Sequence, residues 1–177
     1  MAAEIIIVLF LILANGLLAL AEFAIVSARK ARLQERADDG NRGARAALAL
    51  ANEPGQFLST VQVGITLVGV LAGAFGGTAI AQGLAPLLAQ VPALKPYSNG
   101  LSLALVVLLI TFLTLVLGEL VPKRLALANA EKIASGIAPF MRSMSRLFAP
   151  VVRLLSASTD LVIRLLGVKP STEPAVT

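Results

Sequence analysis

The chain has 177 residues, of which 57% are hydrophobic and only 14% are charged, and its mean hydropathy is +0.86. Soluble domains carry about 25% charged residues, so this composition excludes an ordinary soluble protein and predicts an all-α integral membrane protein. Cys and His are absent from the sequence, which excludes disulfides, thiolate or imidazole metal sites and histidine proton relays. The net charge of +5 does not predict a nucleic-acid partner, because the basic residues form no patch interleaved with aromatic residues.

Residues 4–27 are predicted to form the first membrane span, and they are not a secretory signal peptide because the basic cluster follows the apolar run. Residues 28–55 are expected to form a cytoplasmic connector, a helical hairpin that turns at the polar residues 38–41 and ends in a second turn at 53–55. The second apolar run covers residues 56–75 and the third covers 101–117. Between them, residues 79–89 are expected to form a short interfacial or re-entrant helix.

The C-terminal third stays apolar but is interrupted by charges. Arg153, Asp160 and Arg164 are seven and four residues apart, which places them on one helical face. This pattern favours a juxtamembrane amphipathic helix over a fourth span for residues 146–168. The Pro-containing residues 169–177 are interpreted as a linker. The expected organisation is therefore a transport domain at 1–145, an amphipathic helix at 146–168 and a linker at 169–177 that leads to a cytoplasmic domain.

The distribution of basic residues predicts the orientation. Basic residues gather at 28–53 and 123–169, whereas only Lys95 lies between the second and third apolar runs. The positive-inside rule then places the N-terminus and the 77–99 loop outside the cell (inner) membrane, with the C-terminus in the cytoplasm after three spans. A chain of this length holds only a few spans of about 20 residues, so a homodimer is the expected transport unit.

The strongest candidate site lies at the end of the third span. Glu119 is an ionisable residue at the edge of an apolar run, where a charge is costly and needs a purpose. Pro122 cannot donate a hydrogen bond to the carbonyl of Gly118, four residues earlier. A carboxylate beside a free carbonyl is suited to Mg²⁺ or Ca²⁺. The alternative is a helix end at which Glu119 reaches the headgroup region and pairs with Lys123 or Arg124.

Two polar residues of the first span share one face. Asn15 and Glu22 are seven residues apart and are expected to point into the bundle, away from lipid. They could line an ion path, or form an interhelical hydrogen bond worth about 1 kcal/mol. Ser27 lies off this face, at the cytoplasmic end, where an irregular helix end would turn it inward.

The second span carries a stripe of small and polar residues at steps of three and four: Ser59, Gln62, Thr66, Gly69 and Gly73. Such a stripe either packs helices closely or lines a polar path. Gly69 and Gly73 match the spacing of close-packed helix pairs, so they are assigned to helix or dimer packing. The three polar residues are candidates for the ion path or for ligands.

Three ordered segments resemble the transmembrane domain of the CorC/cyclin M family of Mg²⁺ transporters: residues 15–33, 57–67 (FLSTVQVGITL) and 118–123 (GELVPK). The resemblance implies a homodimer of three-span subunits with a juxtamembrane belt, which exports Mg²⁺ in exchange for Na⁺. The resemblance also implies that a CBS-pair domain follows this one in the full protein. ATP would act only through that domain. The family's second motif often has Asn residues after the glycine, where this chain has Ile65 and Thr66. This difference shifts the expected ligands to Ser59, Gln62 and the backbone near Gly64.

The sequence therefore predicts one dehydrated Mg²⁺ site per subunit. The expected ligands are Glu119, Gly118, Ser27, Ser59 and Gly64, and the expected ion path or coupling-cation site comprises Asn15, Glu22, Gln62, Thr66 and Pro122. The alternative function is a membrane anchor and dimerisation module without transport of its own. An enzyme is not expected, because no nucleophile and base pair or phosphate-binding loop is present.

Overall fold

The computed structural model describes residues 2–166, and all regular structure within this range is helical. The elements in chain order are α1 (Ala2–Ser27), α2 (Lys30–Asp38), α3 (Arg42–Asn52), α4 (Pro54–Leu88), η1 (Lys95–Tyr97), α5 (Ser98–Leu115), η2 (Val116–Leu120), α6 (Val121–Ala128) and α7 (Ala130–Leu165). The linker predicted at 169–177 lies outside the described residues.

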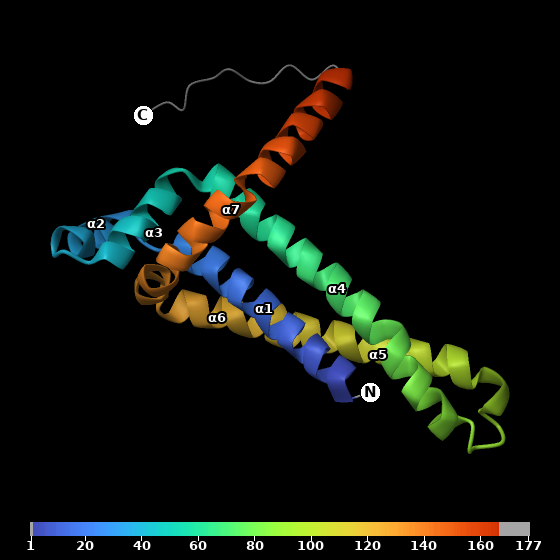
Figure 1. The fold of residues 1–177 in the computed structure, drawn as a ribbon. Coiled ribbons are helices and arrows are strands. Elements are labelled where there is room, and N and C mark those ends of the chain that lie inside the picture. The colour runs from blue at the N-terminus through green and yellow to red at the C-terminus, as the bar shows by residue number, and fades with distance from the viewer. Residues whose placement is uncertain (1, 167–177) are drawn as a thin grey trace.

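Within the described range, three stretches are long and apolar enough to span a membrane: Ala2–Ser27, Pro54–Leu88 and Lys95–Ala128. The prediction of three spans is confirmed at this level. Their outer faces are rich in exposed Leu, Ile, Val and Phe, as expected of surfaces that meet lipid. In Figure 1, α1 lies between α4 and the helical rod made by α5, η2 and α6.

The second span is longer than the sequence indicated. Pro54 and Gly55 were expected in a turn, but they form the first turn of α4, because Pro at the first helical position loses no hydrogen bond there. The helix also continues through Pro86 to Leu88, so residues 79–89 are not a separate re-entrant helix. One unbroken helix of 35 residues replaces the two shorter elements.

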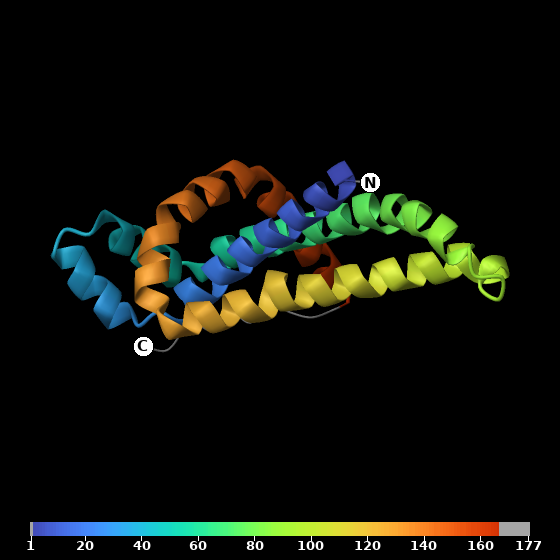
Figure 2. The same ribbon diagram turned by 90° about the horizontal axis from the view of Figure 1, so that it is seen from below.

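The connector forms the predicted hairpin of two short helices, α2 and α3. Gly40 takes a positive φ of 88° at the turn, a conformation that side-chain-bearing residues rarely adopt. Asn41 then caps α3, since its Oδ1 accepts a hydrogen bond from the Ala44 backbone N–H at 3.0 Å. The hairpin and the 89–97 loop lie at opposite ends of the molecule (Figure 2).

Helix α7 is continuous from Ala130 to Leu165 and contains Pro139 and Pro150. It is not among the candidate spans of the described chain, which agrees with an amphipathic helix. The helix predicted to begin at residue 146 is the second half of α7, so no break accompanies the expected boundary. Its first half packs on α3 and on the end of α1, and this junction holds the main core, including Leu33, Phe57 and Met141, each fully buried.

Candidate functional site

The predicted residues of α1 and the third span meet where α1 crosses η2. The Val121 backbone N–H donates to the Val116 carbonyl five residues earlier, so η2 is a π-helical turn. Pro122 follows directly and has no N–H, so it cannot donate a hydrogen bond to the Gly118 carbonyl four residues earlier. That carbonyl is not free, however: the Asn15 Nδ2 donates a hydrogen bond to the Gly118 oxygen at 3.1 Å. The Gly118 carbonyl, expected to be free, therefore has a partner in this conformation, and its role as an ion ligand stays a prediction.

Asn15 is 7% exposed, and its Oδ1 has no hydrogen-bond partner among the described residues. The interhelical hydrogen bond weighed as an alternative for Asn15 is therefore present. It leaves one buried amide oxygen unpaired, which costs about 1–3 kcal/mol unless a ligand or water supplies a partner.

Two glycines make the crossing possible. A Cβ at Gly16 would lie 2.8 Å from the Leu117 carbonyl oxygen and 3.2 Å from Pro122 Cγ, and one at Gly118 would lie 3.1 Å from Asn15 Nδ2. Sequence reasoning missed Gly16, although its place beside Asn15 in the first motif was the available signal. Close packing within the chain therefore occurs at this crossing.

Glu119 lies beside this crossing, and its side chain pairs with a lysine one helical turn later in the chain. Its Oε1 is 2.6 Å from Lys123 Nζ, and the Lys123 Nζ also lies 4.6 Å from the centroid of the Phe23 ring on α1. The Glu119 side chain is 43% exposed. The local pairing that the sequence offered as an alternative is thus the geometry observed, and in this conformation the carboxylate is already neutralised.

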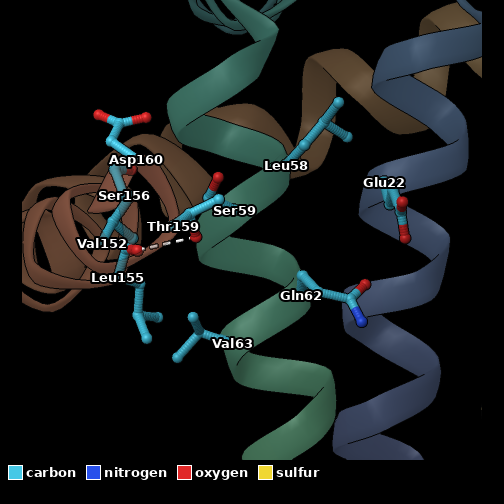
Figure 3. Close-up of a pocket in the computed structure, with 10 residues that line it drawn as sticks. All are labelled: Glu22, Leu58, Ser59, Gln62, Val63, Val152, Leu155, Ser156, Thr159 and Asp160. Atoms are coloured by element: carbon cyan, nitrogen blue, oxygen red, sulfur yellow. Dashed lines mark hydrogen bonds between the residues drawn. The ribbon is translucent and has the colours of Figure 1, made fainter. Parts of the chain in front are cut away.

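A second group of predicted residues lines a cavity of about 570 Å³ between α1, α4 and α7. Glu22 comes from α1, and Ser59 and Gln62 come from α4. Figure 3 shows Gln62 reaching from α4 toward α1 near Glu22, with Asp160 of α7 on the other side of Ser59. The structure therefore joins Glu22, Ser59 and Gln62, but Glu119 is not part of this lining.

The contribution of α7 to this cavity was not predicted. Ser156, Thr159 and Asp160 line it, and the Thr159 hydroxyl donates to the Leu155 carbonyl at 2.9 Å. The sequence placed Asp160 with Arg153 and Arg164 on the charged face of an amphipathic helix, and no signal within α7 indicated the cavity. Among residues 2–166, neither Glu22 nor Asp160 forms an ion pair within 4.0 Å.

The remaining predicted residues lie elsewhere. Ser27 and Thr66 are exposed, on α1 and α4 respectively, and neither lines the cavity. Gly64 allows α1 to approach α4, because a Cβ there would lie 2.8 Å from Leu18 Cδ1. No group of three or more Asp or Glu side chains that could hold a metal occurs in the described part of the chain.

Gly69 and Gly73 line a mainly apolar hollow of about 260 Å³ between α4 and α5, together with Thr111 and Thr114. A Cβ at either glycine would meet nothing within 4 Å. They therefore mediate no close helix contact inside one chain. Their assignment to packing stays a prediction about a second copy.

The model of the cyclin M transmembrane N-terminal domain matches residues 6–177. The chain belongs to this family. A UPF0053 protein of Synechocystis sp. is 52% identical over 93% of this chain, and UPF0053 protein YhdT of Bacillus subtilis is 35% identical over 86%. A polyamine export protein of Haemophilus influenzae is 26% identical over 94%. The chain spans only 37%, 33% and 38% of these three relatives, respectively.

Proposed function

We propose that this cyclin M domain exports Mg²⁺ across the cell membrane, as a homodimer and in exchange for Na⁺. The observation that carries the proposal is the cavity that brings Glu22, Ser59 and Gln62 together. Two carboxylates without ion-pair partners, a side-chain amide and hydroxyl groups supply the oxygen ligands that Mg²⁺ prefers. The volume of about 570 Å³ leaves room for water molecules that the ion gives up reluctantly.

The ion would leave this cavity for the crossing of α1 and η2, where two bonds oppose its binding. Lys123 holds Glu119, and Asn15 holds the Gly118 carbonyl. A cation that binds Glu119 and Gly118 has to replace both partners. We therefore propose that the present conformation has a closed dehydrated site, and that alternating access involves movement of α1 against η2.

Mg²⁺ efflux from loaded proteoliposomes tests this function. Glu22→Gln and Glu119→Gln are each expected to lower the initial efflux rate at least about tenfold, the effect of losing about 1.4 kcal/mol of ion binding. Glu35→Gln is the matched control, because Glu35 is exposed on α2 and outside the cavity. An inward Na⁺ gradient should accelerate efflux, and an equal K⁺ gradient should not. Unchanged efflux in Glu22→Gln would reject the proposed path.

A polyamine is a second candidate substrate, favoured by the similarity to the polyamine export protein of Haemophilus influenzae. Glu22 and Asp160 reach one cavity from different helices, which suits a linear cation with an amine at each end. Radiolabelled spermidine and Mg²⁺, assayed in the same proteoliposomes, separate the two. Asp160→Asn should impair spermidine export more than Mg²⁺ export if the polyamine is the substrate.

The anchor and dimerisation module remains the alternative without transport. It expects no efflux of either cation. It also expects Glu119→Gln to lower the unfolding temperature equally with and without Mg²⁺, whereas a transport site expects the difference to grow when Mg²⁺ is added.

A further inference from the structure

A smaller cavity of about 190 Å³ lies where the end of α3, the start of α4 and the middle of α7 meet. Figure 1 shows α7 passing the first turns of α4 at this junction. The polar residues that line it are Glu53, Gln56, Arg142, Ser145 and Arg146. None of them lines the cavity of Glu22, so this is a separate feature.

Ser145 is buried in the wall of this cavity without a partner. Its side chain is 6% exposed, and its Oγ makes no hydrogen bond within the described chain. Ser135 and Ser143 on the same helix behave differently, because each donates to the carbonyl four residues earlier. A buried hydroxyl left unpaired is destabilising, so a ligand that paired the Ser145 Oγ would be favoured here.

The start of α4 adds unpaired donors. Pro54 has no N–H, and the Glu53 side chain makes no capping hydrogen bond. Helix geometry therefore leaves the backbone N–H groups of Gly55 and Gln56 without acceptors inside α4, and of these two residues Gln56 lines the cavity. These groups are at the positive end of a 35-residue helix, the place where phosphate and other anions bind.

Two arginines complete the site. Arg142 and Arg146 are one helical turn apart on α7, where like charges repel each other. Neither forms an ion pair within 4.0 Å in the described structure. Glu53 is the one lining group that opposes an anion, and the two guanidinium groups together with the helix end outweigh its single charge.

We propose that this cavity binds a phosphate group, with Arg142 and Arg146 supplying charge and Ser145 and the first turn of α4 supplying hydrogen bonds. Because α4 is a candidate span that begins here, the phosphate of a lipid headgroup is one source. A soluble phosphate compound is the other. Either one would pair the Ser145 hydroxyl, relieve the repulsion of the arginines and tie α3, α4 and α7 together.

Thermal unfolding of the purified, delipidated protein tests the site, followed by circular dichroism in detergent without Mg²⁺. One arm adds inorganic phosphate against chloride at equal ionic strength. The other adds phosphatidylglycerol to the micelles, against a galactolipid that lacks phosphate. Stabilisation by phosphatidylglycerol alone identifies a lipid headgroup, and stabilisation by inorganic phosphate identifies a soluble phosphate group.

Ser145→Ala and the double variant Arg142→Gln/Arg146→Gln should weaken the apparent affinity at least about tenfold, because each removes hydrogen bonds to a charged group. Arg164→Gln, elsewhere on α7, is the charge-matched control and should respond like wild type. Without anion, Ser145→Ala should be at least as stable as wild type, because it removes an unpaired hydroxyl.

The proposal would be overturned if neither phosphate nor phosphatidylglycerol stabilised the wild type. It would also be overturned if Ser145→Ala and the double arginine variant were stabilised as much as wild type. Glu22→Gln should respond normally, which separates this site from the proposed transport function.

Discussion

Two regions of this cyclin M domain use polar residues of the same helix in opposite ways. Where α1 crosses η2, Asn15 is 7% exposed and backbones touch at glycines. Where α1 faces α4 and α7, Glu22 borders a cavity of about 570 Å³ and has no ion-pair partner in the described structure. In this conformation the crossing is tightly packed, whereas the cavity has spare volume and unpaired charge for a ligand. Substitutions at the crossing should therefore change stability, and substitutions at the cavity should change binding.

The largest effect is expected from Gly16→Ala. The added Cβ meets the Leu117 carbonyl oxygen at 2.8 Å, so the free energy of unfolding should fall by about 1–3 kcal/mol. Gly136→Ala is the matched control on α7, where nothing lies within 4 Å of the added Cβ, and it should be neutral or stabilising. Equal stability of the two variants in denaturant titrations would show that the crossing is not tightly packed.

The next effect concerns the cavity. Glu22→Gln should weaken Mg²⁺ binding about tenfold in a calorimetric titration, because it removes one of two unpaired carboxylates. Its free energy of unfolding without Mg²⁺ should stay within about 0.5 kcal/mol of wild type. A large loss of stability with unchanged Mg²⁺ affinity would reverse the roles of the two regions.

Asn15→Leu should lower the free energy of unfolding by about 1 kcal/mol. It breaks the bond to the Gly118 carbonyl, but it also removes the unpaired Oδ1, so the loss is partly offset. Amide hydrogen exchange in residues 116–122 should accelerate at the same time. Unchanged exchange there would mean that Asn15 does not hold the π-helical turn.

A smaller effect is expected from the Glu119–Lys123 pair. A double-mutant cycle with Glu119→Gln and Lys123→Met should give a coupling of about 0.2–1 kcal/mol, because both side chains are partly exposed. High salt should reduce this coupling. A coupling free energy well above this range would indicate that the Glu119–Lys123 pair strongly stabilises the closed conformation of the site.

The smallest effect lies outside both regions, at the start of α7. The backbone N–H of Glu131 lowers the pKa of its carboxyl below 4.5, and the Arg29 N–H and the charges of Arg32 and Arg29 act in the same direction against desolvation. The resulting stability is present above the ordinary pKa and is lost as the pH falls through the lowered one. Wild type and Glu131→Gln should thus differ by about 0.5 kcal/mol or less at neutral pH and converge in acid.

Periodicity and composition predicted the elements that depend on the chain's own pattern. The three spans and the connector hairpin follow from hydropathy and turn chemistry. Two errors arose where a local rule was overridden. Pro54 was placed in a turn, but it starts α4, and a break was expected after residue 75, where α4 continues to Leu88.

The site was only partly predictable because its parts come from different helices. Spacing correctly placed Asn15 and Glu22 on one face, yet it could not show that they meet different neighbours, η2 and the α4–α7 cavity. Likewise, no pattern within α7 could show that Asp160 reaches the lining that Glu22 shares. Such proximity depends on the packing of whole helices, which a single sequence does not encode locally.

The continuity of α7 has a mechanical consequence. Its 36 residues measure about 54 Å along an axis that bends (Figure 2), and Asp160 lies little more than one turn from its described end. A helix transmits displacement along its axis with little compression, and its bends are confined to sites such as Pro139 and Pro150. A pull or twist of a few ångströms near Leu165 would therefore widen or narrow the mouth of the cavity before it disturbed the crossing of α1 and η2.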